Sequence, residues 1–483
     1  MTRITTTAVL GSLVLIAACG TRPTPPRNLL VITLDTMRAD RLPPYGAGDL
    51  RTPALSRLAA EGAVFDQAFA SVPLTLPSHA TLFTGLQPPR LGVRDNAGAP
   101  VSQSVLTLAE MLEAKGMKTG AVLASGVLAP GRGLEQGFAD YGLAKSTNCS
   151  TAHARRSAEE VVSDGIGWLE GNSSSPFFLW LHLYDTHQPH VLPAQYANAH
   201  FDSYAAAIAY EDAQIARVIA YLESHELLSN TLIVIAGDHG ESLGEHGEDT
   251  HGILLYQTVL QVPLILRGPG IRSGRVSTAV RLIDVMPTIT DLFALPRPEW
   301  LDGSTLVPLL NGQAQEADRE VYAESLYPLR FGWAALRSLR AAQYKLIDGP
   351  TPELYDLSRD PFEQDNIIAT RAASASAMRE RLRIIDSGDA DRTIAQASPE
   401  VTARLSSLGY ASGPVRAVDS NELRNPKDYI HEFNDITARQ ASFNHAFGCG
   451  PSPSRATEAS PAVSVERGAV SESARHASAT TRR

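Results

Sequence analysis

Short stretches of consecutive apolar residues alternate with amphipathic stretches from about residue 29 to about residue 300. The apolar stretches are NLLVITLD, KTGAVLA, FFLWLHLYD and TLIVIAGD, and each has the length of a strand. Residues 52–65, 105–116, 156–171 and 204–225 instead repeat their apolar positions with the period of a helix. Strands that are apolar on both faces and alternate with helices indicate a parallel sheet covered on both sides. The pattern therefore predicts an α/β fold with a mostly parallel central sheet.

The pattern changes at about residue 315. Three stretches separated by turn residues then have the pattern of short strands: EVYAES, LRSLRAAQYKLID and PELYDLSRDP. We predict a main domain over 29–315 and a small antiparallel α+β subdomain over 316–415. Residues 416–483 are expected to form one more helical stretch and then a disordered tail, because large apolar residues almost disappear after about residue 446.

The first 19 residues have the pattern of a bacterial lipoprotein signal. Arg3 precedes an apolar run that ends in IAAC, an order typical of a signal peptide with small residues at its cleavage site. A transmembrane helix is the alternative, but the apolar run is short for a full span. IAAC resembles the motif in which the cysteine, here Cys19, becomes the lipidated N-terminus. We therefore expect a signal peptide over 1–19, an extended tether over 20–28 and a lipid anchor in the bacterial cell envelope, facing the periplasm or the cell surface.

The chain is acidic, with 52 aspartate and glutamate residues against 42 lysine and arginine residues and a net charge of −10. Nucleic acid is not expected as a partner, because binding its phosphates requires a basic face. An acidic chain that binds an anionic substrate needs a local positive charge, most simply a metal ion. A structural zinc site is not indicated, since Cys149 and Cys449 both lack a CxxC partner.

Three of the apolar strands end in acidic or histidine residues. NLLVITLD ends at Asp35, FFLWLHLYDTH at Asp185 and His187, and TLIVIAGDHG at Asp238 and His239. In an open parallel sheet, ligands bind beyond the carboxyl ends of the strands. The carboxylates of Asp35 and Asp238 and the imidazole of His239 suit a divalent cation, and Mn, Mg, Zn and Ca all stay open. Asp185 alone has an equally good structural explanation, because aspartate also caps loops and helices.

The segment TLPSH places Thr75 at the start of a further helical stretch. Unpaired N–H groups at a helix N-terminus favour anions, so Thr75 stands where an anionic group would bind. The structural alternative is that Thr75 only caps the helix. A free threonine hydroxyl is a poor nucleophile, but contact with a divalent cation makes its proton easier to remove.

Taken together, these motifs resemble the sulfatase family of the alkaline phosphatase superfamily. The resemblance covers residues 29 to about 370 and rests on VITLDTMRADR, TPALSRLAAEG, PLTLPSHATLFTGLQPP, GVRDN, YDTHQPH, GDHGESLGEHGEDTHG, LIDVMPT and ELYDLSRDP. It implies an alkaline phosphatase-like α/β/α sandwich with a smaller C-terminal sheet subdomain. It also implies in-line attack on a sulfate or phosphate ester with one or two divalent metal ions, of which we expect one.

The resemblance assigns roles to residues that match the family motifs. The implied metal ligands are Asp35, Asp238, His239 and Thr75. The implied catalytic residues are Thr75 as nucleophile and His187 and His251 as the histidines nearest the leaving group. The side chains expected to contact the transferring group are Asn96, Arg94 and His79.

This chain departs from the family pattern at three places. Thr36 follows Asp35 where many members have a second aspartate, and this resembles the phosphonate monoester hydrolase branch. His79 stands where the motif has an arginine, and Arg94 either replaces that positive charge or lies on the surface. Thr75 stands where many members carry a cysteine or serine that is oxidised to formylglycine, a change that threonine cannot undergo.

The threonine decides which ester we expect. The hydrate of formylglycine releases sulfate by collapsing back to an aldehyde, whereas a threonyl ester must be cleaved by water or passed to an acceptor. Phosphothreonine suits this route and threonyl sulfate has no comparable one, so we favour a phosphate diester or a phosphonate over a sulfate ester. The alternatives are a true sulfuric ester hydrolase, a phosphoryl-type transferase and an inactive binding lipoprotein. The expected substrate is a small-molecule, glycan or lipid ester.

Overall fold

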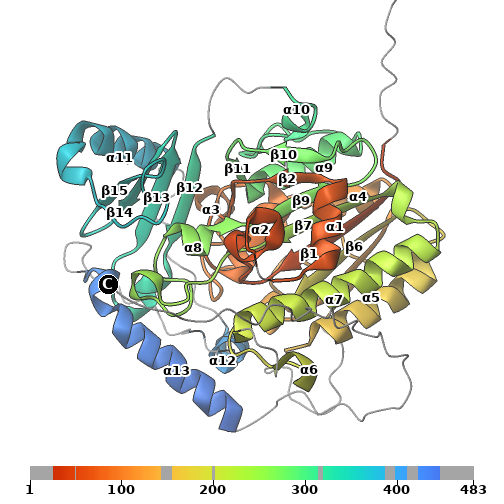
Figure 1. Ribbon diagram of the computed structural model, residues 1–483, viewed down its shortest axis with the longest axis horizontal. Helices are drawn as coiled ribbons and strands as arrows, with labels where there is room; N and C mark the ends of the chain where they lie inside the picture. Colours follow the sequence, from red (N-terminus) through yellow and green to blue (C-terminus); the bar gives the residue numbers. More distant parts are fainter. Residues whose placement is uncertain are drawn as a thin grey trace, which may run out of the picture. The chain divides into compact units, whose positions relative to one another are not determined.

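The structure of the protein is a computed structural model (Figure 1). It describes residues 25–48, 50–142, 155–197, 202–313, 319–386, 398–408, 410 and 423–446. The predicted signal peptide with Cys19, the first residues of the predicted tether and the predicted tail lie outside the described residues. In the described part of the chain, no helix is both long enough and apolar enough to cross a membrane.

A sheet of eight strands forms the centre of the fold. Its strands are β1 (Asn28–Leu34), β2 (Ala63–Phe65), β4 (Lys118–Leu123), β5 (Asp140–Gly142), β6 (Phe177–Leu183), β7 (Thr231–Gly237), β9 (Leu264–Arg267) and β10 (Gly274–Val276). Their order is β10-β2-β9-β7-β1-β6-β4-β5. β1 runs parallel to β6 and β7, and β4 runs parallel to β5 and β6, whereas β9 is antiparallel to both of its neighbours. The predicted mostly parallel central sheet is confirmed.

Alternate residues of β1 face opposite layers of helices. Leu29 and Val31 belong to one core with residues of α2 (Thr75–Thr84), α4 (Leu108–Ala114) and α9 (Val285–Leu292). Leu30 and Ile32 belong to a second core with residues of α1 (Pro53–Glu61), α5 (Ala158–Asn172) and α7 (Ser203–Ser224). Because both faces of the strand are buried, the sequence of β1 shows no polar alternation. The two helical layers confirm the α/β/α sandwich (Figure 1).

The first predicted helix is shorter than the sequence indicates. The apolar pattern predicts a helix over 52–65, but α1 ends at Glu61 and the next residues form β2. A side chain on Gly62 would lie 2.4 Å from the carbonyl oxygen of Leu266, because β2 pairs closely with β9. The apolar residues of β2 therefore extend the helical pattern without belonging to the helix.

A second, four-stranded antiparallel sheet follows, as predicted. Its strands are β12 (Val321–Ser325), β13 (Leu336–Ala341), β14 (Tyr344–Asp348) and β15 (Glu353–Asp356), and α11 (Ala372–Asp386) packs on it. Two later helices are α12 (Pro399–Ser407) and α13 (Ile430–Ala446). The shorter elements are β3 (Ala68–Phe69), β8 (Gln261–Val262), β11 (Val280–Arg281), α3 (Pro88–Leu91), α6 (Ala194–Ala197), α8 (Gln257–Leu260) and α10 (Val307–Leu310). The domain boundary at 315 stays a prediction, since residues 314–318 lie outside the described ranges.

Candidate active site

The carboxyl ends of β7, β1 and β6 are neighbours in the central sheet. Leu34 of β1 pairs with Gly237 of β7 and with Leu183 of β6, so the residues that follow these strands leave the sheet at the same level. Asp35 and Asp238 are the next residues of β1 and β7, and both are fully buried. The structure therefore gathers the strand-end residues at one edge of the sheet, as the sequence predicts.

Asp35, Asp238 and His239 form a cluster in which one ligand atom of each lies within 4.8 Å of the others. His239 donates its Nδ1–H to the carbonyl oxygen of Gly240 at 2.9 Å, which leaves the lone pair of Nε2 free. This Nε2 atom lies 3.9 Å from Oδ1 of Asp35 and 3.6 Å from Oδ2 of Asp238. Within the described part of the chain, none of these three buried atoms has a hydrogen-bond partner. Buried polar atoms are rarely left unpaired, and a cation would satisfy all three.

The charges of the cluster also favour a cation. Burial raises the pKa of both Asp35 and Asp238 above the usual range, and the charge of Asp35 raises the pKa of Asp238 further. Burial lowers the pKa of His239 to about 3, so its imidazole is neutral. Two carboxylates that repel each other beside a neutral imidazole are stable in their ionised form only when a positive charge lies between them. The oxygen and nitrogen donors therefore fit a divalent cation.

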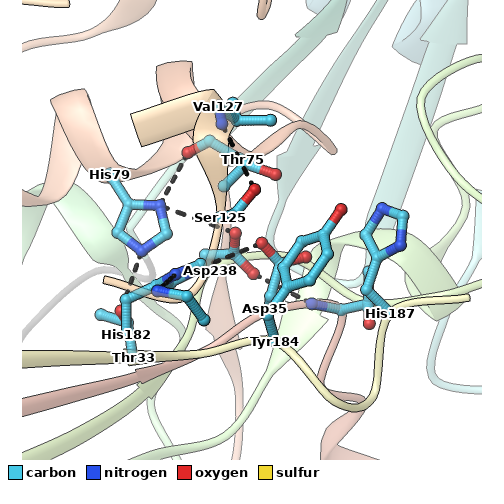
Figure 2. Close-up of polar contacts among 12 residues, drawn as sticks. Thr33, Asp35, Thr75, His79, Ser125, Val127, His182, Tyr184, His187 and Asp238 are labelled. Atoms are coloured by element: carbon cyan, nitrogen blue, oxygen red, sulfur yellow. Dashed lines mark hydrogen bonds and ion pairs between the residues drawn. The ribbon is translucent and has the colours of Figure 1, made fainter. Parts of the chain in front are cut away.

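Thr75 is the first residue of α2, and it lies beside Asp35 and Asp238 (Figure 2). Among the described residues, its buried hydroxyl also has no hydrogen-bond partner. Asn96 caps the helix, because its Oδ1 accepts the N–H of Leu76 at 2.9 Å. Ser78 connects the first turn of α2 to the cluster, because its hydroxyl donates to the carbonyl oxygen of Asp238 at 2.5 Å. The nucleophile expected from the sequence thus stands at a helix N-terminus next to the candidate cation site.

His79 lies one helical turn after Thr75 and holds it in place. Its Nδ1–H donates to the carbonyl oxygen of Thr75 at 2.7 Å, and its Nε2 accepts the hydroxyl hydrogen of Thr33 at 2.9 Å (Figure 2). Thr33 is oriented for this bond because its oxygen accepts the indole N–H of Trp180 at 2.9 Å. Burial lowers the pKa of His79 well below its usual range, so the ring carries no charge. These contacts favour a positioning role for His79 over the predicted contact with substrate.

A second trio, His79, His182 and Asp238, also meets the distance condition for a cation. Its ring nitrogens are already used in hydrogen bonds, however. His182 accepts the N–H of Ala124 at Nδ1, 3.4 Å away, and donates from Nε2 to Oδ2 of Asp35 at 3.2 Å. The trio with unpaired atoms is therefore the better cation site, and His182 orients Asp35 within it.

His187 and His251 lie next to this cluster, with their ring centres 5.0 Å apart. The ring of His187 stacks on Tyr184 at 4.3 Å, and the ring of His251 lies 4.5 Å from that of His239. His251 donates its Nδ1–H to Oε1 of Glu241 at 2.9 Å. Burial lowers the pKa of both rings, that of His251 to about 4, so both are neutral. The structure brings the two histidines of the predicted site together.

The remaining side chains predicted to bind substrate differ in their surroundings. Asn96 has a buried Nδ2 group without a hydrogen-bond partner in the described ranges, while its Oδ1 caps α2. Its N–H groups are therefore available to bind an oxygen of the substrate. Arg94 is buried, which corrects the alternative that it lies on the surface. Its guanidinium bonds to Glu324 of β12 at 2.8 Å and to Asp386 of α11 at 2.9 Å. This engagement favours a structural role for Arg94.

Besides His182, three residues that the sequence does not single out contact the site: Arg155, Glu241 and Tyr410. Arg155 donates to the carbonyl oxygen of His187 at 3.0 Å and so holds the turn after β6. The hydroxyl of Tyr410 lies within hydrogen-bond distance of both predicted histidines. Glu241 directly follows GDHG and could have been found from that motif, whereas no motif surrounds Arg155 or Tyr410.

Comparisons with known proteins identify similar families and folds. Residues 27–295 match the family model described as Sulfatase, and residues 244–386 match the one described as N-sulphoglucosamine sulphohydrolase, C-terminal. The chain is 26% identical to choline-sulfatase of Rhizobium meliloti (strain 1021) over 427 residues, which is 70% of this chain and 82% of that protein. It is 33% identical to arylsulfatase K of Bos taurus over 199 residues, which is 38% of this chain and 36% of that protein. The structure of phosphonate monoester hydrolase of Agrobacterium radiobacter is similar with a TM-score of 0.64 and 22% identity, covering 76% of this chain and 96% of that one.

Proposed function

The chain belongs to the sulfatase family and is an ester hydrolase, and we propose that it cleaves a phosphate diester or a phosphonate monoester with Thr75 as the nucleophile. One observation carries this proposal. Four buried atoms without a hydrogen-bond partner in the described part of the chain gather at the strand edge: Oγ1 of Thr75, Oδ1 of Asp35, Oδ2 of Asp238 and Nε2 of His239. A hydroxyl nucleophile and three ligand atoms thus lie together, and the Thr75 side chain also interacts with those of Asp35 and Tyr410.

The same four side chains would hold a single divalent cation. When bound, the cation makes the proton of the Thr75 hydroxyl easier to remove and balances negative charge on the transferring group. The expectation of one cation is supported by the second trio, whose ring nitrogens are engaged in hydrogen bonds. The donor set of carboxylate, imidazole and hydroxyl groups suits Mn, Mg, Zn or Ca.

In the first step, the Thr75 oxygen attacks phosphorus. A new O–P bond forms, the bond from phosphorus to the leaving oxygen breaks, and the leaving oxygen takes up a proton. Neutral His187 and His251 each have a lone pair on Nε2, so either can accept the proton that Thr75 loses and pass it to the leaving oxygen. The unpaired Nδ2 group of Asn96 would bind a nonbridging oxygen.

In the second step, water attacks phosphorus and the O–P bond to Thr75 breaks. The histidine that protonated the leaving oxygen now takes a proton from the water, and Thr75 recovers its own proton. A threonyl ester has no other way to release its acid group by hydrolysis, since Thr75 cannot form the hydrated aldehyde of formylglycine. This requirement is the reason for favouring phosphorus over sulfur.

A sulfate ester is the second candidate substrate. It is favoured by the similarity to choline-sulfatase, which extends over 82% of that protein. In that case Thr75 would carry sulfate between the two steps, or water would attack sulfur directly.

Trapping of the intermediate tests the role of Thr75. The protein without residues 1–19 is mixed with bis(p-nitrophenyl) phosphate, quenched in acid and digested, and the peptide that contains Thr75 is analysed by mass spectrometry. We expect a phosphoryl adduct on Thr75 in the wild type and on the serine of Thr75→Ser, and none in Thr75→Ala. Turnover by Thr75→Ala at the wild-type rate would overturn the proposal.

We also propose that a lipid on Cys19 anchors the protein in the bacterial cell envelope. The support is the IAAC sequence and the tether predicted to follow it. A lipid precursor fed to cells should label the wild type but not Cys19→Ala, which should move to the soluble fraction. Equal labelling of both proteins would contradict the anchor.

A further inference from the structure

Tyr410 reaches the active site from the C-terminal part of the chain, three positions after the end of α12. Its hydroxyl oxygen lies 3.1 Å from Nε2 of His187 and 3.3 Å from Nε2 of His251, and the residue is only 5% exposed. Its ring centre lies 6.3 Å from that of Tyr327. A phenol is therefore held between the two histidines that the proposed reaction places at the leaving oxygen.

The hydroxyl of Tyr410 can satisfy only one of these histidines. Nδ1 of His187 faces the carbonyl oxygen of Gln188 at 2.5 Å, and Nδ1 of His251 faces the carboxylate of Glu241 at 2.9 Å. Nδ1 of His187 therefore carries the ring proton, and so does Nδ1 of His251 when Glu241 is ionised, in which case both Nε2 atoms present lone pairs. Because a phenol has a single hydrogen, one Nε2 atom faces an oxygen lone pair. Tyr410 thus forms a hydrogen bond with only one of the two histidines, and another group could replace it.

A leaving oxygen must occupy the place that the Tyr410 oxygen now holds. His187 or His251 can protonate that oxygen only from Nε2, at a distance of about 2.6–3.2 Å. The Tyr410 oxygen is already at that distance from His187, and a second oxygen cannot share the position. Thr75 is fully buried while Tyr410 stands there. Binding of a leaving group and the present position of Tyr410 therefore exclude each other.

We propose that Tyr410 is a specificity-determining residue, whose phenol occupies the leaving-group position and is displaced by substrates with an aromatic leaving group. The proposal rests on the proposed function, from which it takes the roles of the two histidines. The position already accommodates a phenol ring, and its neighbours His187, His251 and Tyr327 are themselves rings that can pack against another. An alkyl leaving group would fill less of this space. It would therefore replace fewer of the contacts that are lost when Tyr410 is displaced.

Two substitutions separate the hydroxyl from the ring. Tyr410→Phe removes only the competing oxygen, and Tyr410→Ala also removes the ring. Kinetics are measured with phenyl and methyl esters of one phosphonate, and Tyr221→Phe is the control, because Tyr221 of α7 instead stacks on His225. We expect both Tyr410 variants to lower KM for the phenyl ester about threefold or more while kcat changes less than about twofold, with a smaller effect on the methyl ester. A tenfold loss of kcat in Tyr410→Phe at constant KM, or no change in either variant, would overturn the proposal.

Free phenol provides a readout that does not depend on turnover. Tyr410→Ala has room for a phenol molecule between the histidines, so phenol should raise the Tm of this variant and leave those of the wild type and Tyr410→Phe unchanged. Stabilisation of Tyr410→Ala by phenol without any Thr75-dependent turnover would overturn the proposed function, and with it the leaving-group role of this position. Thr75-dependent turnover without stabilisation by phenol would overturn the assignment of Tyr410 alone. If Tyr410→Ala does not fold, the KM of Tyr410→Phe for the phenyl ester tests the assignment of Tyr410.

Discussion

Nε2 of His239 faces Oδ1 of Asp35 across 3.9 Å, at the ends of two neighbouring parallel strands. Neither buried atom has a hydrogen-bond partner in the described part of the chain. A neutral imidazole does not stabilise a buried carboxylate across such a distance, whereas a cation between them would. With the hydroxyl of Thr75 beside them, the two residues belong to a cluster that could hold a metal ion.

Asp238→Asn should abolish cation binding. The asparagine keeps an oxygen for the N–H groups of Thr36 and His239, which bond to Oδ1 at 3.1 and 2.7 Å, but it removes the charge. Metal analysis should find no bound cation, and added cation should no longer stabilise the fold. The wild type should gain about 2.7 kcal/mol at about one hundred times Kd.

Asp212→Asn is the matched control for that experiment. Asp212 is also buried and also accepts two backbone N–H groups, those of Ala54 and Leu55, but it belongs to α7. This variant should keep its metal. Full metal content in Asp238→Asn would refute the assigned ligand set.

His79→Gln should weaken catalysis more than His79→Asn. The amide of asparagine can replace Nδ1 as donor to the carbonyl oxygen of Thr75, whereas that of glutamine lies at the position of Nε2, which faces Thr33. Loss of the hydrogen bond to Thr75 is worth about 1 kcal/mol, so kcat of His79→Gln should fall roughly fivefold further than that of His79→Asn. Steady-state kinetics check this order, and the reverse order would show that His79 acts in another way.

Glu241→Gln should lower kcat with little change in KM. Glu241 accepts the Nδ1–H of His251 and so directs Nε2 toward the reaction, but it does not contact substrate itself. Replacing this oriented carboxyl group should lower kcat about 10- to 100-fold. The control is Glu353→Gln, a buried glutamate that instead bonds to Tyr256 at 2.7 Å. Equal effects of the two substitutions would indicate a general loss of stability and not a positioning role.

Ionisation of Glu248 should contribute a decrease in the free energy of unfolding as the pH rises from about 5 to about 8, opposite in sign to the contribution of the buried neutral histidines below about pH 6.5. Burial raises the pKa of this glutamate from 4.5 to about 8 in the folded protein. Over this window the folded chain keeps a proton that the unfolded chain has released, so rising pH favours unfolding by up to about 1.4 kcal/mol per pH unit. Urea unfolding at several pH values should show a shallower decline for Glu248→Gln, which cannot ionise. Parallel declines would rule out this assignment.

The part of the site that depends on strand ends could be predicted from the sequence. Asp35 and Asp238 each directly follow an unbroken apolar strand, and parallel strands bring their carboxyl ends to one edge of a sheet. The position of Thr75 at a helix start is equally local, since the TLPSH segment signals it. These features follow from short stretches of chain and from one general property of parallel sheets.

Contacts between distant segments could not be predicted in this way. The partners of Arg94, which are Glu324 and Asp386, come from β12 and α11, so no local pattern shows that its charge is already used. Tyr410 enters the site from beyond a short helix, and no periodicity reveals where its side chain points. The end of α1 was misplaced for a related reason, because pairing of β2 with β9 outweighs the helical pattern around Gly62.

The most direct test of the proposed reaction compares substrates side by side. The protein without residues 1–19 is assayed with an aryl sulfate, an aryl phosphate monoester, an aryl phosphodiester and an aryl phosphonate, each with Mn, Mg, Zn and Ca. We predict turnover of the phosphodiester or the phosphonate, and a loss of at least about a thousandfold in Thr75→Ala. Turnover of the sulfate that depends on Thr75 and exceeds that of every phosphorus ester would contradict the preference for phosphorus. Turnover that persists in Thr75→Ala would contradict the nucleophile itself.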